Sequence, residues 1–342
     1  MTRNGTRSFA RTRQWRIRIA LLATGVALTL IGLEVSLRVA VPQWRDLVPQ
    51  RFMTETAGGI LAGVPNFNGR VASLFGDFDV PLQFDGRGFR NPPTADPAAP
   101  LIFVGDSFCQ GWGITDAESF ATRAAAALDI SAYNYCTVGA DLLDDLHIVQ
   151  AWRPPRRGGA TVLTVTFEND VLAYRDQLEG APTESVQGLS RSFWSRWLMQ
   201  HSALFDVTTT LARQSAVIVA AVRRLGLVSG VPIATDAGVD PIAASVRVVE
   251  HIRDAVGGGL FIVVTVPPRP GQIEFNDYDA FVRALRGAGF DVIDPRAEGV
   301  SITTIPHDGH WDAATHAAIA PLVAARLRAR GDGRGVMPDG AR

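Results

Sequence analysis

Ser107, His310 and Asp308 are residues whose types suit nucleophilic acyl chemistry. Ser107 stands in a Gly-Asp-Ser turn after the apolar run 101–104, and a serine hydroxyl becomes a nucleophile when a base takes its proton. His310 is a candidate base, and Asp308 can reach its other ring nitrogen across a tight turn. In a simpler interpretation, Asp106 and Ser107 only cap the helix that follows.

An acyl-transfer site also needs donors for the oxyanion that forms on attack. The backbone N–H groups of Ser107 and Gly139 and the side-chain amide of Asn169 are of this kind, and each follows an apolar segment. Because the carboxyl ends of parallel strands meet at one edge of a sheet, we expect these groups to lie beside Asp308 and His310.

The elements that must position these groups alternate between apolar strands and helices. Strands are predicted over 101–104, 130–135, 161–166, 260–266 and 290–293. Helices are predicted over 115–128, 141–152, 240–256 and 277–286, and a last helix ends near residue 330. A capping box begins at Thr115, Gly287 is an expected C-cap, and Pro321 should kink or break the last helix. This order predicts a three-layer α/β/α domain, doubly wound around a five-stranded parallel sheet.

The amino terminus is typical of a membrane anchor. Residues 1–18 carry several arginines and no acidic residue, and 19–41 is long and apolar enough to cross a bilayer, which takes roughly 20 residues. The basic flank favours a single-pass protein of the cytoplasmic membrane with its amino terminus in the cytoplasm and the remainder in the periplasm. The alternative is a cleaved signal peptide with a site near 39–42. A buried core helix is disfavoured because 19–33 has no polar face.

The rest of the chain divides into three segments, the second of which carries an insertion. Residues 42–98, rich in proline and glycine, are expected to form an extended spacer with some packed aromatic residues, and 99–330 the main domain. An insertion at 171–239 is predicted to be helical and to form a lid, a partner surface or, more simply, part of the main core. Residues 331–342 are predicted to be a flexible tail.

Charge and cysteine content narrow the possible partners. The net charge of −1 provides no basic field for nucleic acid. The two cysteines, Cys109 and Cys136, lack the spacing of a metal site and form either a disulfide in an oxidising compartment or two unrelated buried thiols. A competing interpretation of the carboxyl-terminal histidines is a metal cluster of His307, Asp308, His310, Asp312 and His316. Residues elsewhere in the sequence do not add ligands to it.

These residues, in this order, resemble the four blocks of the SGNH hydrolases, also called GDSL esterases and lipases. The matching residues are Gly105-Asp106-Ser107, Gly139, Asn169-Asp170, and Asp308 with His310. The chain looks closest to bacterial members with an amino-terminal anchor, which share the Gly88-Phe89-Arg90 turn and an ending like Asp308-Gly309-His310-Trp311. The resemblance covers about residues 84–328 apart from the insertion.

The resemblance implies a flavodoxin-like fold and assigns a role to each matching residue. Ser107 would be the nucleophile and first oxyanion donor, Gly139 and Asn169 would complete the oxyanion hole, His310 would be the base and Asp308 would orient it. No metal or organic cofactor is implied. The expected substrate is an acyl ester, with acetyl esters of an envelope or secreted polysaccharide as the favoured class.

The chain also departs from the family pattern at two points. Phe167-Glu168 precedes Asn169 where the family usually has a glycine, and the last block is Asp-x-His instead of Asp-x-x-His. The shorter spacing also occurs in alginate-type O-acetyltransferases of this superfamily, so an O-acyltransferase with the same triad is the alternative. A membrane-tethered scaffold or carbohydrate-binding protein without activity is a third hypothesis. The sequence leaves the oligomeric state open.

Overall fold

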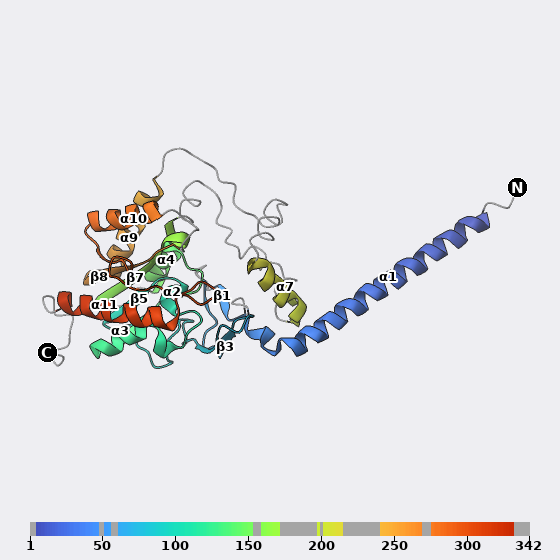
Figure 1. Ribbon diagram of the computed structural model, residues 1–342, viewed down its shortest axis with the longest axis horizontal. Coiled ribbons are helices and arrows are strands. Elements are labelled where there is room, and N and C mark those ends of the chain that lie inside the picture. The colour runs from blue at the N-terminus through green and yellow to red at the C-terminus, as the bar shows by residue number, and fades with distance from the viewer. Residues whose placement is uncertain are drawn as a thin grey trace.

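The computed structural model describes residues 5–47, 51–55, 61–152, 159–171, 197–198, 201–214, 240–268 and 275–331. Its centre is a five-stranded parallel sheet in the order β6-β5-β7-β8-β9 (Figure 1). The strands are β5 (Leu101–Val104), β6 (Ala132–Asn134), β7 (Ala160–Thr166), β8 (Leu260–Val266) and β9 (Asp291–Ile293). The predicted doubly wound parallel sheet is therefore confirmed.

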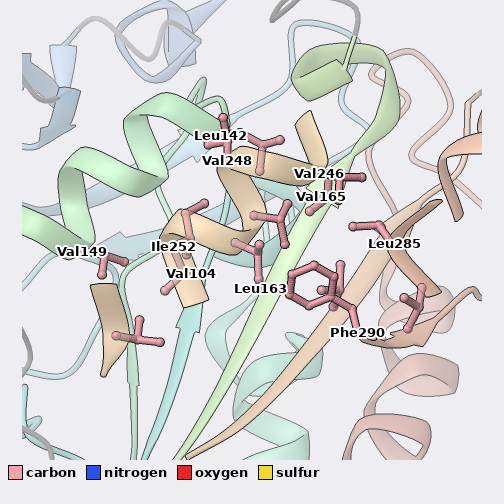
Figure 2. Packing of buried hydrophobic residues seen from close by; sticks show 14 of the residues in the cluster. Val104, Leu142, Val149, Leu163, Val165, Val246, Val248, Ile252, Leu285 and Phe290 are labelled. Carbon is pink, nitrogen blue, oxygen red and sulfur yellow. The ribbon is translucent and has the colours of Figure 1, made fainter. Parts of the chain in front are cut away.

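Helices cover both faces of the sheet, because alternate residues of its strands point to opposite sides. Ile102 and Val104 of β5 pack into one apolar cluster, part of which Figure 2 shows. Leu101 and Phe103 pack into another. The helices of the first cluster are α4 (Leu142–Trp152), α9 (Pro241–Val256) and α10 (Phe275–Gly287). Those of the second are α3 (Phe120–Leu128) and α11 (Ala313–Gly331). The predicted three layers are thus present.

Several helix ends differ in detail from the prediction. The capping box at Thr115 is present, but it opens the 3-10 turn η3 (Asp116–Glu118), and Ser119 then caps α3. Helix α10 includes Gly287, and Gly289 takes the left-handed conformation after it. Helix α11 continues through Pro321 without a break. Pro321 is exposed, so water can bind the backbone carbonyl that loses its N–H partner there.

The segment 42–98, predicted to be an extended spacer, is instead folded against the domain. After the 3-10 turn η1 (Pro42–Asp46) it forms two antiparallel hairpins. These pair β1 (Met53–Glu55) with β2 (Leu61–Gly63), and β3 (Asn68–Ala72) with β4 (Asp79–Gln83). They share an apolar cluster with the main domain, made of Phe52, Val71, Leu82, Phe84 and Trp112. Burial of these side chains, worth about 1.5–3 kcal/mol for each large one, holds the hairpins on the domain.

The amino-terminal helix α1 (Gly5–Ala40) extends away from the rest of the protein (Figure 1). Its stretch Trp15–Ala40 has 26 residues and a mean hydropathy of 2.0, and none of its most apolar part is buried, so it is long and apolar enough to cross a membrane. From the predicted insertion, the structure describes the helix α7 (Ala203–Gln214) and a few residues around it. The rest of the insertion and the predicted tail after Gly331 lie outside the described residues.

Helix α7 packs against the end of α1. The carboxylate of Glu34 accepts hydrogen bonds from the backbone N–H groups of Ala203 and Leu204, both at 2.9 Å. A negative side chain at this place satisfies the free N–H groups of a helix amino terminus. Trp44, Leu47, Ala72, Ala203 and Val207 form an apolar cluster beside this contact. The described part of the insertion therefore packs against the end of α1 and the turn η1.

Candidate active site

The backbone turn after β5 places Ser107 at the carboxyl edge of the sheet. Gly105 has φ of +145°, and a Cβ there would lie 2.9 Å from the carbonyl oxygen of Thr164, so only glycine fits this turn. Asp106 accepts a hydrogen bond from the N–H of Phe108 at 3.0 Å and caps the short helix α2 (Ser107–Gln110). The capping interpretation thus holds for Asp106, and it leaves the hydroxyl of Ser107 available for another partner.

That partner is His310. The Oγ atom of Ser107 lies 2.7 Å from Nε2 of His310, although 203 residues separate them in sequence. On the other side of the ring, Nδ1 of His310 is hydrogen-bonded to Oδ1 of Asp308. An ionised carboxylate can only accept, so Nδ1 carries the proton and Nε2 is left to accept the proton of Ser107. The ring of Phe108 lies 4.8 Å from that of His310 and covers it.

A tight turn holds Asp308 and His310 in this arrangement. The N–H of Ile305 donates to the carbonyl of His310 at 2.8 Å, and the N–H of Gly309 donates to the carbonyl of Ile305 at 2.9 Å. The backbone N–H of His310 also donates to Oδ1 of Asp308 at 3.2 Å. The two-residue spacing therefore suffices to bring the carboxylate onto Nδ1.

Trp112 is a site residue to which sequence reasoning assigned no role. Its indole N–H donates to Oδ2 of Asp308 at 3.0 Å, so both carboxylate oxygens are bound. Burial favours the neutral acid, but the hydrogen bond and charge of His310 and the bond from Trp112 outweigh it, and the pKa of Asp308 lies below its ordinary value. Asp308 is thus ionised at neutral pH. The residue type itself is a sequence signal for such a role, because the indole N–H of a buried tryptophan needs a hydrogen-bond acceptor.

Of the expected oxyanion donors, Asn169 lies directly beside the nucleophile turn. It stands in the turn Phe167–Val171 that follows β7, and its side chain is close enough to Asp106 to favour the ionised form of that carboxyl group. Gly139 is exposed in the loop after β6, with φ of +78°. This loop is attached to the nucleophile turn, because the N–H of Thr137 donates to the carbonyl of Gly105 at 3.0 Å.

Asp106 of the turn interacts with two further buried carboxyl groups, those of Asp145 and Asp170. Burial raises the pKa of Asp106, even though Thr166, the charge of His310, Phe108 and Asn169 stabilise its ionised form. Burial and then the charge of Asp106 raise the pKa of Asp145 and Asp170 well above their ordinary values. Asp170 also accepts a hydrogen bond from the N–H of Thr166 at 2.6 Å. Protonated forms of these side chains avoid placing like charges together in the protein interior.

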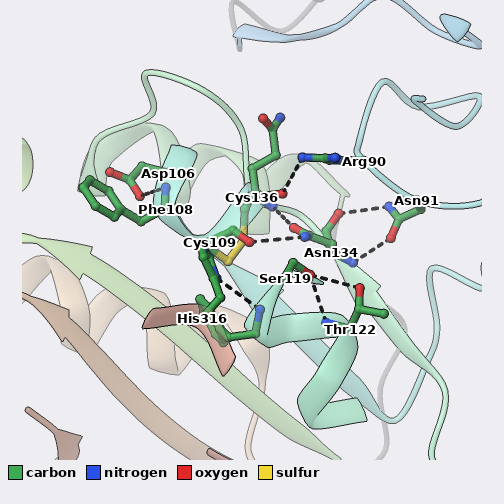
Figure 3. The surroundings of a disulfide bond; sticks show 12 residues. Arg90, Asn91, Asp106, Phe108, Cys109, Ser119, Thr122, Asn134, Cys136 and His316 are labelled. Atoms are coloured by element: carbon green, nitrogen blue, oxygen red, sulfur yellow. Dashed lines mark hydrogen bonds between the residues drawn. A yellow bond between two sulfur atoms is a disulfide. The ribbon is translucent and has the colours of Figure 1, made fainter. Parts of the chain in front are cut away.

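A disulfide between Cys109 and Cys136 links the nucleophile helix to the loop after β6 (Figure 3). Their Cα atoms are 5.6 Å apart, within the range that a disulfide spans. Of the two possibilities left by the sequence, the structure therefore has the bridge. Cys109 lies two residues after Ser107, so the bridge constrains the backbone that carries the hydroxyl.

Arg90 supports the same backbone from the other side. Its buried guanidinium donates to the carbonyls of Gly111 and Ile114, the latter at 2.8 Å, and forms an ion pair with Asp116. Gly111 ends the nucleophile helix. In the sequence, the Gly88-Phe89-Arg90 turn is recognised only as part of the family resemblance. In the structure, the turn supplies a charged side chain that fixes the loop leading to Trp112.

The proposed histidine metal cluster does not form in the structure. Nδ1 of His316 accepts from the N–H of Phe120 at 3.1 Å, and burial lowers its pKa to about 3, so this ring is a neutral part of the core. Nδ1 of His307 lies 3.0 Å from Oδ1 of Asp77. Over the residues that the structure describes, no group of three or more His, Cys, Asp or Glu side chains is placed to hold a metal ion.

A cavity of about 440 Å³ opens at the other end of the sheet, where β8 and β9 begin. Some of its charged lining residues pair with one another: Arg326 binds Asp291 and Glu298, and Arg330 binds Asp291 at 3.1 Å. None of its lining residues belongs to the site around Ser107.

Comparisons with known proteins give distant structural similarities. No family model and no curated sequence matches the chain. A lipolytic protein of the G-D-S-L family from Veillonella parvula is 11% identical, with a TM-score of 0.38 over 67% of this chain and 98% of its own. A family two carbohydrate esterase from Clostridium thermocellum, solved in complex with cellohexaose, is 13% identical, with a TM-score of 0.35 over 69% of this chain and 64% of its own. A carbohydrate esterase family 2 enzyme of Corynascus thermopiles (Myceliophthora fergusii) is 16% identical, with a TM-score of 0.37 over 67% of this chain and 65% of its own.

Proposed function

We propose that the protein is a serine esterase that cleaves O-acyl esters through an acyl-enzyme. The observation that carries this proposal is the hydrogen-bonded line from Ser107 through His310 to Asp308. Nε2 of His310 takes the proton of Ser107 as Oγ attacks the ester carbonyl, and Asp308 stabilises the imidazolium that results. The N–H groups of Ser107 and Gly139 and the amide of Asn169 are the proposed donors to the oxyanion.

Collapse of the tetrahedral intermediate completes the first half of the reaction. The alkoxide leaves with the proton held on His310, and the acyl group stays on Ser107. His310 then removes a proton from a water molecule, the new hydroxide attacks the acyl carbonyl, and Ser107 is released with its proton restored. Acetyl esters of an envelope or secreted polysaccharide are the proposed natural substrates.

The second candidate is an O-acyltransferase, favoured by the Asp308-Gly309-His310 spacing. It shares the acyl-enzyme and differs only in the acceptor, which is a sugar hydroxyl instead of water. Release of free acetate from the acyl-enzyme when soluble sugar is present supports hydrolysis, whereas transfer of the acetyl label to the sugar supports the transferase.

We further propose that 19–41 is an uncleaved anchor, with 1–18 in the cytoplasm and the domain in the periplasm. Cleavage near 39–42 would remove Glu34 and Arg38, the side chains that contact the amino-terminal end of α7. The disulfide of Cys109 and Cys136 fits an oxidising compartment.

A fluorophosphonate probe tests the proposed nucleophile on the full chain in detergent micelles. Intact mass should show one adduct on the wild-type protein and none on Ser107→Ala or His310→Ala. Both variants should keep the unfolding midpoint of the wild type within a few degrees, because neither removes a large apolar side chain. Absence of an adduct on folded wild-type protein would favour a scaffold or carbohydrate-binding protein.

A further inference from the structure

An exposed pair of rings borders the candidate active site and takes no part in the proposed chemistry. Phe75, in the loop between β3 and β4, is 48% exposed, and the side chain of His307 is 57% exposed. Their ring centroids lie 4.7 Å apart with the planes inclined by 34°. Single exposed apolar side chains are common on protein surfaces, so the contacts that fix this ring and its place beside the site carry the argument.

The geometry of this pair is fixed by polar contacts. Nδ1 of His307 lies 3.0 Å from Oδ1 of Asp77, whose own side chain is only 8% exposed. The hydroxyl of Ser73 donates to the other oxygen of Asp77 at 2.9 Å and accepts from the N–H of Phe75 at 3.1 Å. One small network therefore holds both the ring of His307 and the backbone of Phe75. Because the two rings stack on each other, His307 supports one face of Phe75 and fixes the orientation of its ring.

The pair must lie close to the reacting atoms. His307 comes directly before Asp308 and three residues before His310, which places its Cα within roughly 11 Å of that of His310. Phe78, on the same loop as Phe75, packs edge-on against Trp112 at 6.0 Å, and Trp112 binds Asp308. A ligand on the exposed part of the Phe75 ring would thus lie near the turn that holds Asp308 and His310.

We infer that Phe75, supported by His307, forms a stacking platform for a pyranose ring of the substrate, adjacent to the ester that Ser107 attacks. This inference rests on the proposed function and names the substrate class as a carbohydrate ester. The C–H face of a pyranose is flat, apolar and uncharged and suits an aromatic surface, while the polar edge of the ring stays in water. The segment that carries Phe75 is therefore part of the substrate site.

The test compares two esters on the full chain in detergent micelles. One is p-nitrophenyl acetate, which has no sugar, and the other is soluble O-acetylated xylan. Phe75→Ala should raise KM for the xylan about tenfold, the effect of losing roughly one ring contact, and leave kcat/KM for p-nitrophenyl acetate unchanged. Phe75→Trp should restore the wild-type KM. Leu211→Ala, which truncates an apolar side chain that is 44% exposed on α7, is the matched control and should change neither value.

A binding measurement separates this inference from the proposed function. On a Ser107→Ala background, calorimetry with O-acetylated xylo-oligosaccharide should show about tenfold weaker binding when Phe75→Ala is added. Equal affinities with and without that change, or no binding on the Ser107→Ala background, would overturn the platform. Lack of turnover of both esters by wild-type protein that still binds the oligosaccharide through Phe75 would overturn the esterase and support the platform.

Discussion

The hydrogen bond from Trp112 to Asp308 gives the most direct test of how the site is held together. Trp112→Phe removes the indole N–H and keeps an aromatic ring among Phe52, Phe78 and His310. A hydrogen bond to a charged group contributes about 1.5–3 kcal/mol, and the partial exposure of Asp308 favours the lower end. If the whole effect reached the transition state, kcat/KM would fall by about tenfold.

The expected loss is in kcat more than in KM, because Asp308 contributes when His310 becomes charged. The assay is hydrolysis of p-nitrophenyl acetate by the full chain in detergent, with unfolding midpoints measured in parallel. Trp152→Phe is the matched control, since it removes an indole N–H from a ring that packs on Phe89, away from Asp308. Wild-type kcat in a well-folded Trp112→Phe variant would show that the turn alone positions Asp308 and would refute the reasoning.

The acid stability of the fold should depend on His316. The pKa of His316 in the folded protein is about 3, below the ordinary 6.5, so between these pH values only the unfolded chain protonates this ring. The free energy of unfolding should therefore fall by about 1.4 kcal/mol per pH unit as the pH decreases from 6.5 toward 3. In His316→Gln, the free energy of unfolding measured with urea should depend less on pH over this range, and an unchanged slope would contradict the prediction. Reduction of the disulfide between Cys109 and Cys136, which are 27 residues apart, should lower the free energy of unfolding by about 3.5 kcal/mol. The urea midpoint should fall when dithiothreitol is added to the wild type, and dithiothreitol should have no effect on a Cys109→Ala, Cys136→Ala double variant. Gly105→Ala should lower stability by at least about 2 kcal/mol and abolish fluorophosphonate labelling at temperatures where the fold persists; normal labelling would mean that the turn can relax.

The sheet could be predicted well because its strands are marked locally. The ranges 101–104 and 260–266 agree with β5 and β8 residue for residue, since both are almost entirely apolar and are buried on two faces. The range 130–135 shrinks to Ala132–Asn134 because this edge strand has one neighbour, which it pairs over three residues. The length of an edge strand depends on its partner, which periodicity does not show.

The hairpins and the supporting site residues could not be predicted in the same way. Pairing of Val71 with Val80 depends on the register between two short strands, and proline and glycine around them favour a prediction of irregular chain. The hydrogen-bond partner of Trp112, Asp308, is 196 residues away in sequence. The residue type of Trp112 therefore shows that its indole N–H needs an acceptor, but it does not show which residue provides it. The catalytic roles of Ser107, His310 and Asp308 stay predictions until the labelling experiment.

The folded segment 42–98 changes what the proposed anchor at 19–41 would do to the site. Trp44, next to the end of α1, packs in one cluster with Ala72 of β3, and the loop after β3 carries Phe75 onto His307. Packed contacts thus run from the end of α1 to the turn that holds Asp308, whereas a flexible spacer would let the domain move freely. In the proposed anchored arrangement, the site is held at a fixed height and orientation relative to the bilayer. Its substrates would then be esters presented near the membrane surface, such as a polysaccharide passing through the envelope, and polymers far from the membrane would be out of reach.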